Sequence, residues 1–281
     1  MRNRVVYATD DNYWMQLYVS VYSLLSNNTD ESFEIFIIAN ERDSTFDKRV
    51  PHLEDVHPDF ELDIIEVGDI ELQDAPEPKW FSKGIYYRLF VGSQLSDITG
   101  NVLYLDCDTI VDGSISELFE TPLNEYAVAA VPEQRNKSFL IGLPIGYPFY
   151  NTGILYIDLD GWRAQEVEQQ AIDYIAEKDD LRLPMQQVLN TIFYKEDLCK
   201  PLSPKYNTSE RWSESIDRWN IDTEPTIIHY TGADKPWLYQ TRRQHKDLWW
   251  EYLEQTPYRD YTPPNKTIQD QTRKILKRVW K

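Results

Sequence analysis

The first hundred residues alternate between short apolar runs and segments with a helical pattern. Runs rich in β-branched and aromatic residues, typical of buried strands, lie at residues 5–8, 33–39 and 62–67. The intervening segments at residues 14–27 and 44–56, the second of them largely polar, favour helices. This alternation predicts a parallel sheet with helices on both faces and with ligands bound beyond the carboxyl ends of the strands.

The same pattern continues through the rest of the chain. Further strands are predicted at residues 101–105, 126–131, 153–159 and 226–230. Helices are predicted at residues 166–177 and 185–194. We find no internal repeat or low-complexity tract. We therefore expect one α/β domain over residues 1–245, followed by a helical C-terminal segment over residues 246–281.

The composition narrows the function classes. The chain has 281 residues, of which 41% are hydrophobic, and this is enough for a packed core. It carries 29 basic and 47 acidic residues, a formal net charge of -18. Such a charge repels nucleic-acid phosphates, so nonspecific DNA or RNA binding is excluded.

Cysteine content and hydropathy indicate the compartment. Cys107 and Cys199 are the two cysteines, too few for a disulfide framework, so a reducing compartment is expected. The N-terminus has too short an apolar stretch for a signal peptide, and no run approaches the length of a membrane span. We therefore expect a cytoplasmic protein.

Two acids at a strand end are the strongest chemical signal. Asp106 and Asp108 directly follow the apolar run at residues 101–105. As the strand turns into a loop, the two carboxylates can converge on one hard cation, and a divalent metal bridging two phosphates suits such a pair. The alternative is that the pair only caps the following turn.

A second polar element follows the predicted strand at residues 226–230. It supplies His229, Gly232 and Lys235 within seven positions. Neutral imidazole can complete a metal site, glycine permits close backbone approach to a ligand, and lysine offers a compact charge for phosphate. The alternative for His229 is a purely structural role at the strand end.

Taken together, these segments resemble the family 8 glycosyltransferases of the GT-A fold. This group of retaining enzymes includes bacterial lipopolysaccharide galactosyl- and glucosyltransferases and glycogenin. The segments are YATDDNYW (7–14), LYLDCDTIV (103–111) and HYTGADKPW (229–237), with weaker matches at YYRLF (86–90) and YNTGILYIDLDGWR (150–163). The resemblance implies a Rossmann-like nucleotide-diphospho-sugar transferase fold, with a mixed, mainly parallel sheet, flanking helices and a short C-terminal helical appendage.

The resemblance also implies a binding site for a UDP-sugar donor. It assigns the uracil and ribose to Ala8, Asp10, Asn12 and Tyr13, although Asp10 and Asn12 also suit an ordinary helix N-cap. Arg88 matches an arginine that contacts the donor sugar or phosphate. Cys107 and Gly232 lie within the matching motifs and belong to the same implied set.

A metal site is implied as well. Asp106, Asp108 and His229 match three ligands of Mn²⁺ (or Mg²⁺), and the metal together with Lys235 would neutralise charge that develops on UDP. Asn151 and Gly153 match a loop beside the donor sugar, where an ordinary turn is the competing explanation.

One segment departs from the family pattern. Gln186 matches a glutamine near the anomeric carbon, but Met185 and Gln187 replace the two acids of the usual DQDxLN pattern. Methionine cannot act as a nucleophile, which favours transfer on the face from which UDP leaves, with Gln186 steadying the sugar. The catalytic set is then Gln186, Lys235 and Asp108. Glu133 is a candidate acceptor contact or a plain surface glutamate.

The expected function is metal-dependent, retaining transfer of a hexose, galactose or glucose, from a UDP-sugar to a glycan, glycolipid or glycoprotein. One alternative is a haloacid-dehalogenase-type phosphatase, since DCDTIV resembles its DxDxT signature. That signature normally follows the first strand, and the downstream pair Asp179-Asp180 follows a helical pattern instead of a strand. Another alternative, motivated by Met185, is a non-catalytic UDP-sugar binding protein.

The end of the chain differs electrostatically from the rest. Residues 273–281 (RKILKRVWK) carry five basic residues and no acid. Their apolar residues share one helical face, which favours peripheral contact with anionic lipid at the inner membrane face. The alternative is a frayed, solvated end.

Overall fold

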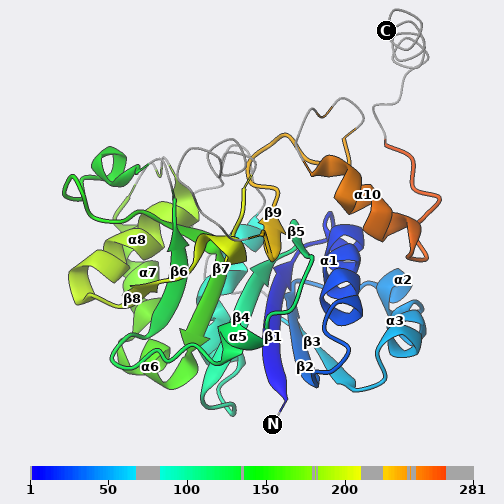
Figure 1. Ribbon diagram of the computed structural model, residues 1–281. Coiled ribbons are helices and arrows are strands. Elements are labelled where there is room, and N and C mark those ends of the chain that lie inside the picture. The colour runs from blue at the N-terminus through cyan, green and yellow to red at the C-terminus, as the bar shows by residue number, and fades with distance from the viewer. Residues whose placement is uncertain are drawn as a thin grey trace, which may run out of the picture.

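The computed structural model describes residues 2–67, 83–133, 136–178, 181, 183–209, 224–238, 241 and 245–263. Seven strands form the central sheet in the order β3-β2-β1-β4-β7-β6-β8 (Figure 1). Their bounds are β1 Asn3–Thr9, β2 Phe33–Ala39, β3 Phe60–Glu66, β4 Asn101–Asp106, β6 Val128–Pro132, β7 Tyr150–Asp158 and β8 Cys199–Pro201. A second, two-stranded sheet pairs β5 (Thr109–Val111) with β9 (Ile227–His229).

The central sheet is mixed and mainly parallel. β1 runs parallel to β2 and β4, β2 runs parallel to β3, and β6 runs parallel to β8. Only β7 is antiparallel, and it pairs with β4 on one side and β6 on the other. The predicted fold class is therefore confirmed.

Continuous apolar strands form because the sheet is covered on both faces. In β1, Val5 and Tyr7 point into one buried cluster, whereas Val6 and Ala8 point into the other. Successive side chains of a strand face opposite sides, so a strand buried on both faces must be apolar at every position. This explains why these strands are read easily from the sequence.

Helices make up the two outer layers (Figure 1). One face carries α1 Trp14–Ser26, α2 Ser44–Asp47, α3 Val50–Val56, α5 Ser116–Phe119 and α10 Lys246–Glu254. The other carries η1 Lys83–Phe90, α4 Val91–Gln94, α6 Leu159–Ala164, α7 Val167–Ala176 and α8 Pro184–Glu196. Two further 3₁₀ helices are η2 Ser138–Ile141 and η3 Pro204–Tyr206.

The prediction of one helix over residues 44–56 is wrong in one respect, because this segment forms two helices, α2 and α3. Asp43 caps α2 by accepting a hydrogen bond from the backbone N–H of Phe46. Pro51 lies in the first turn of α3. Since proline has no N–H to continue a preceding helix, it favours the start of a new one.

Helix α10 packs against α1. The Tyr22 hydroxyl donates to Gln255 at 3.3 Å, Asn27 donates to the Tyr252 hydroxyl at 2.6 Å, and Trp249 belongs to the same buried cluster as α1. The boundary at residue 245 stays a prediction. Within the described residues, no helix is both long and apolar enough to cross a membrane. The basic segment at residues 273–281 lies outside the described residues.

Candidate active site

The pairing of β5 with β9 brings distant parts of the chain together. Asp106 ends β4, Cys107 and Asp108 form a turn, and β5 starts at Thr109. Thr109 pairs with His229, and the backbone N–H of Tyr230 donates to the Asp108 carbonyl oxygen at 2.9 Å. The motif at residues 229–237 is thereby held beside the two acids.

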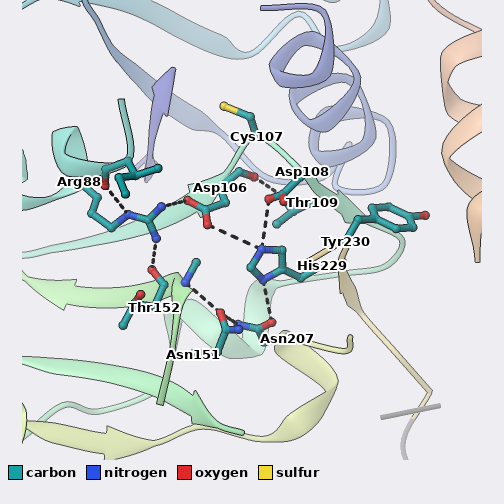
Figure 2. A network of polar contacts seen from close by, with 12 residues as sticks. Arg88, Asp106, Cys107, Asp108, Thr109, Asn151, Thr152, Asn207, His229 and Tyr230 are labelled. Atoms are coloured by element: carbon teal, nitrogen blue, oxygen red, sulfur yellow. Dashed lines mark hydrogen bonds and ion pairs between the residues drawn. The ribbon is translucent and has the colours of Figure 1, made fainter. Parts of the chain in front are cut away.

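Asp106, Asp108 and His229 form one cluster, which we call the Asp–Asp–His cluster (Figure 2). Each residue offers one ligand atom, and these atoms all lie within 4.8 Å of one another. Nε2 of His229 is 3.1 Å from Asp108 Oδ1 and 3.7 Å from Asp106 Oδ2. The three side chains are 18%, 12% and 5% exposed in chain order, so the cluster is largely buried but still open to solvent.

Two cations flank the acids. Arg88 Nη2 lies 2.8 Å from Asp106 Oδ1, and Lys235 forms an ion pair with Asp108. Burial raises the pKa of Asp106, although Arg88 opposes this shift. Burial would also raise the pKa of Asp108, but Lys235 and His229 outweigh it and hold that pKa below its usual range. Each buried carboxylate thus has a positive partner.

Gly153 allows the close approach of β7 to the cluster. A Cβ atom at this position would lie 2.2 Å from His229 Cε1 and 2.5 Å from Asp106 Oδ2. Both distances are far below van der Waals contact. Any side chain here would displace the imidazole or the carboxylate, so glycine is required at this position.

A series of amides continues from His229 to Gln186. His229 Nδ1 is 3.1 Å from Asn207 Oδ1, and Asn207 Nδ2 donates to Asn151 Oδ1 at 3.1 Å (Figure 2). Asn151 Nδ2 and Gln186 Nε2 both donate to Glu133 Oε1, at 3.4 and 2.7 Å. We call Asn207, Asn151, Glu133 and Gln186 the amide chain.

A pocket of about 280 Å³ opens beside the acids. It is lined by Ala8, Thr9, Asp10, Asn12, Tyr13, Gly84, Ile85, Arg88, Tyr104, Asp106, Cys107, Asp108 and Lys235. The pocket lies at the carboxyl ends of β1 and β4, where ligands are expected in α/β folds. The ring of Tyr13 is held by an edge contact with Trp237, with centroids 6.0 Å apart.

Most of the predicted site residues are brought together. Nine line the pocket: Ala8, Asp10, Asn12, Tyr13, Arg88, Asp106, Cys107, Asp108 and Lys235. His229, Asn151, Gly153 and Gln186 lie in the adjoining contacts described above. Gly232 is outside the pocket lining and occupies a left-handed conformation, with φ of 83°, after β9.

Two details of the expected site are corrected. Asn151 and Gly153 do not lie in a loop, because β7 begins at Tyr150 and includes both residues. Asn190 fixes this strand start by bonding both the N–H and the carbonyl oxygen of Tyr150. Tyr13 occupies the N-cap position of α1, and Asp10 instead accepts the backbone N–H of Asn12 at 2.8 Å.

The departure at residues 185 and 187 also has a structural explanation. Met185 is 5% exposed and packs in the buried cluster with α7 and α8. Gln187 is buried, and its Nε2 donates to the Tyr174 hydroxyl at 3.2 Å. Of the three consecutive residues, Gln186 is the one whose side chain bonds to Glu133.

Several site residues were not predicted from the sequence. Tyr104 lines the pocket and donates to Asp106 Oδ1 at 2.7 Å. Residues i and i+2 of a strand share a face, so its position two residues before Asp106 was a usable signal. Asn207 follows the short helix η3, where no periodic pattern marks it.

The mixed sheet, with two acids and an imidazole beyond the carboxyl ends of its strands, has the arrangement of the GT-A fold. The structure of the galactosyltransferase LgtC with donor and acceptor sugar analogues has the same fold. Its TM-score is 0.79 at 22% identity, covering 93% of this chain and 98% of that chain. The chain belongs to glycosyl transferase family 8, whose family model matches residues 4–241.

Curated relatives cover most of the chain. A lipopolysaccharide 1,2-glucosyltransferase of Escherichia coli K12 is 28% identical over 92% of this chain and 80% of that protein. General stress protein A of Bacillus subtilis 168 is 27% identical over 90% and 94%. A lipopolysaccharide 1,3-galactosyltransferase of Salmonella typhimurium LT2 is 25% identical over 83% and 72%. The predicted family is confirmed, which favours the transferase interpretation of the two acids over the phosphatase one.

Proposed function

We propose that this protein transfers galactose or glucose from a UDP-sugar to a glycan, glycolipid or glycoprotein, with retention of the anomeric configuration. The observation that carries this proposal is the convergence of Asp106, Asp108 and His229 beside a pocket that also contains Lys235. Relatives named for lipopolysaccharide glucosyl and galactosyl transfer support the choice of sugar.

The Asp–Asp–His cluster fits a divalent cation. Two carboxylates and one imidazole, with ligand atoms within 4.8 Å of one another, suit Mn²⁺ or Mg²⁺ better than a soft, thiolate-preferring metal. We infer that these three residues hold the ion. When bound, the metal supplies positive charge that stabilises the departing diphosphate.

The pocket offers groups for each part of UDP. The ring of Tyr13 can stack on uracil, and Asp10 and Asn12 carry polar groups for the base and ribose. Ala8 and Cys107 line the same pocket, with Cys107 Sγ directed back to the Ala8 carbonyl oxygen at 3.1 Å.

Arg88 and Lys235 supply positive charge in the lining of the same pocket. Both are buried, and each is paired with one of the two acids. We assign them to the diphosphate and the adjoining sugar. Lys235 can stabilise negative charge on UDP as the glycosidic bond breaks.

The transfer step is proposed to occur on the face from which UDP leaves. Met185 is buried and apolar, so position 185 offers no nucleophile for a covalent route. The departing phosphate oxygen takes the acceptor proton, while Gln186 steadies the sugar. The hydrogen bond that Gln186 donates to Glu133 orients the amide of Gln186. A structure of LgtC is of an active-site mutant in which a glutamine is replaced by glutamate, so a glutamine belongs to the active site of that protein.

Intact mass spectrometry tests the same-face route. The enzyme is incubated with Mn²⁺ and UDP-galactose or UDP-glucose in the absence of acceptor. We expect only the unmodified chain mass. A stable increase of one hexose, mapped to an acidic side chain, would show that transfer passes through a covalent intermediate instead.

The acceptor is proposed to enter beside Glu133. This residue bonds to Gln186 and Asn151 and forms an ion pair with Lys137 at 2.5 Å.

A cytoplasmic location with peripheral contact through residues 273–281 is also proposed, and it would place the site near membrane glycolipids. Deleting residues 273–281 should reduce cofractionation with anionic vesicles, and unchanged cofractionation would remove that part of the proposal.

A thermal-shift screen of nucleotide sugars, with and without Mn²⁺, tests the central proposal. A ligand that binds only the folded state raises Tm, so UDP-hexoses should do so more strongly with the metal. Transfer to a panel of sugars and glycolipids then follows. No shift with any UDP-sugar would refute the proposal, whereas metal-dependent binding without hydrolysis or transfer would support the non-catalytic alternative.

A further inference from the structure

Asn207 lies directly behind the imidazole of the Asp–Asp–His cluster. It is 2% exposed and belongs to none of the motifs that indicated the site. Its side chain lies between His229 and Asn151 (Figure 2). The backbone on its C-terminal side is fixed beside β9, because the N–H of Thr208 donates to Ile227 and that of His229 donates to Thr208, both at 2.9 Å.

A backbone amide determines the orientation of this side chain. The N–H of Gly153 donates to Asn151 at 3.0 Å, and a backbone N–H can only donate. The contacted atom of Asn151 must therefore be its oxygen. The Asn207 atom that bonds to the same oxygen must then be a donor, which identifies it as the amide nitrogen.

The oxygen of Asn207 consequently faces His229 Nδ1 at 3.1 Å. An amide oxygen can only accept, so Nδ1 must carry the hydrogen. In a neutral imidazole the lone pair is then on Nε2, the atom that faces Asp108 and Asp106 at 3.1 and 3.7 Å. When the ring is neutral, Nε2 and the two carboxylate oxygens are therefore three acceptor atoms around one point, an arrangement that a cation stabilises.

We propose that Asn207 is a positioning residue that fixes the tautomer and the ring orientation of His229 for cation binding. This inference rests on the proposed metal-dependent function. A half-turn flip of the Asn207 side-chain amide would place the Asn207 oxygen against the oxygen of Asn151. The surrounding contacts therefore oppose the flipped orientation. Outer partners of ligating histidines typically change metal affinity 10–100-fold when they are removed.

Binding of Mn²⁺ to the full-length chain tests the proposal without an activity assay. It is measured as the loss of the EPR signal of the free ion. Asn207→Leu removes both hydrogen bonds while keeping a side chain that branches at the same carbon, and it should weaken Mn²⁺ binding about 10–100-fold. Asn207→Asp retains an oxygen acceptor for Nδ1–H but loses the N–H that is donated to Asn151. It should therefore be less stable but should bind Mn²⁺ within about tenfold of the wild type. Asn28→Leu is the matched control, because Asn28 is also a buried amide but bonds to Leu24 and Ile115.

A double-mutant cycle separates positioning from general distortion. In a His229→Ala background, Asn207→Leu should cause no further loss of Mn²⁺ affinity, because the imidazole through which it acts is absent. An equal loss in both backgrounds would overturn the inference. So would wild-type affinity in Asn207→Leu.

The conservative variant covers the case in which Asn207→Leu does not fold. A loss of more than about tenfold in a folded Asn207→Asp protein would then contradict the proposal by itself. Failure of the wild type to bind Mn²⁺ at all would instead refute the proposed function. The two failures are therefore distinguishable.

Discussion

The two ends of the candidate site hold their polar side chains by different means. At the Asp–Asp–His cluster, Asp106 and Asp108 are each paired with a full positive charge, from Arg88 and Lys235. Along the amide chain, three neutral amides bond to one another or to Glu133, whose carboxylate is the one group there that is paired with a positive charge, from Lys137. Paired charges suit a charged diphosphate and its cation, whereas amides suit the hydroxyl groups of a neutral sugar.

This difference predicts how much free energy of unfolding a substitution removes at each end of the site. Removing one member of a buried ion pair leaves an uncompensated charge, at a cost of about 3–5 kcal/mol. Removing one amide leaves an unsatisfied polar group, at a cost of about 1–3 kcal/mol. Substitutions at the charged end should therefore reduce both stability and activity more than those along the amide chain.

The largest effect is expected for Asp108→Asn. It removes a charge that faces His229 and leaves the ammonium of Lys235 without its carboxylate. Losing several kcal/mol of charge stabilisation corresponds to a fall in kcat of about 10²–10³-fold. The free energy of unfolding should fall by about 3 kcal/mol.

Steady-state kinetics with a UDP-hexose and urea unfolding measure the two effects of Asp108→Asn. Asp63→Asn is the control, because Asp63 is an exposed carboxylate on β3. Its stability should stay within about 0.5 kcal/mol of the wild type. An unchanged kcat in folded Asp108→Asn would exclude this carboxylate from catalysis.

An intermediate effect is expected for Gly153→Ala. Gly153 lies between the two ends of the site, against His229 and Asp106 on one side and bonded to Asn151 on the other. The added methyl group would overlap His229 and Asp106. Mn²⁺ affinity should fall about 10–100-fold, and the free energy of unfolding should fall by about 1–3 kcal/mol. Isothermal titration calorimetry and thermal unfolding measure these changes.

Gly113→Ala controls for the glycine substitution itself. Its new Cβ would lie 3.6 Å from Thr226 Cγ2, an ordinary contact. Mn²⁺ affinity in this variant should equal that of the wild type. If Gly153→Ala also bound the ion normally, the close approach of β7 would have no role in shaping the cluster.

A smaller effect is expected for Gln186→Ala at the far end of the amide chain. One hydrogen bond of about 1.4 kcal/mol corresponds to a tenfold change, so kcat/KM should fall about tenfold. Metal affinity should not change. Gln169→Ala, an exposed glutamine on α7, is the control, and equal losses in the two variants would argue against a role for Gln186 at the sugar.

The smallest effect concerns the two thiols, of which Cys107 lines the pocket and Cys199 lies outside its lining. Burial raises the pKa of both Cys107 and Cys199 well above the usual range, so both should be alkylated slowly in the folded protein. Cys107 lines the pocket, so UDP with Mn²⁺ should slow its alkylation further and leave Cys199 unaffected. Peptide mass spectrometry measures both rates, and protection of Cys199 alone would contradict the placement of the nucleotide.

The elements that position the site were predictable where a periodic pattern determines them. The predicted bounds of β2 agree with the structure, and the acids were expected at the end of β4. For both elements the local pattern of a buried strand followed by polar residues contains the information. The convergence of the acids with His229, in contrast, was implied by the resemblance to family 8 glycosyltransferases and by no local pattern.

Other features depend on contacts that no local pattern records. The NTG sequence at residues 151–153 suits a turn. It is instead part of a strand, because Tyr150 and Leu155 pair with β6 on either side of it and Asn190 bonds to the backbone of Tyr150. Asn207 acquires its place only through β9 and Asn151. The division of α2 from α3, in contrast, was marked by Pro51 in the sequence and could have been predicted.

The pairing of β5 with β9 has a consequence for biosynthesis. A nascent chain that has emerged only through β8 carries all seven strands of the central sheet but lacks His229 and Lys235. Since domains begin to form as the chain leaves the ribosome, much of the sheet can assemble before the ligand set is complete. If the cluster holds a divalent ion, as proposed, its complete ligand set exists only after translation has passed His229, at the start of the last fifth of the chain.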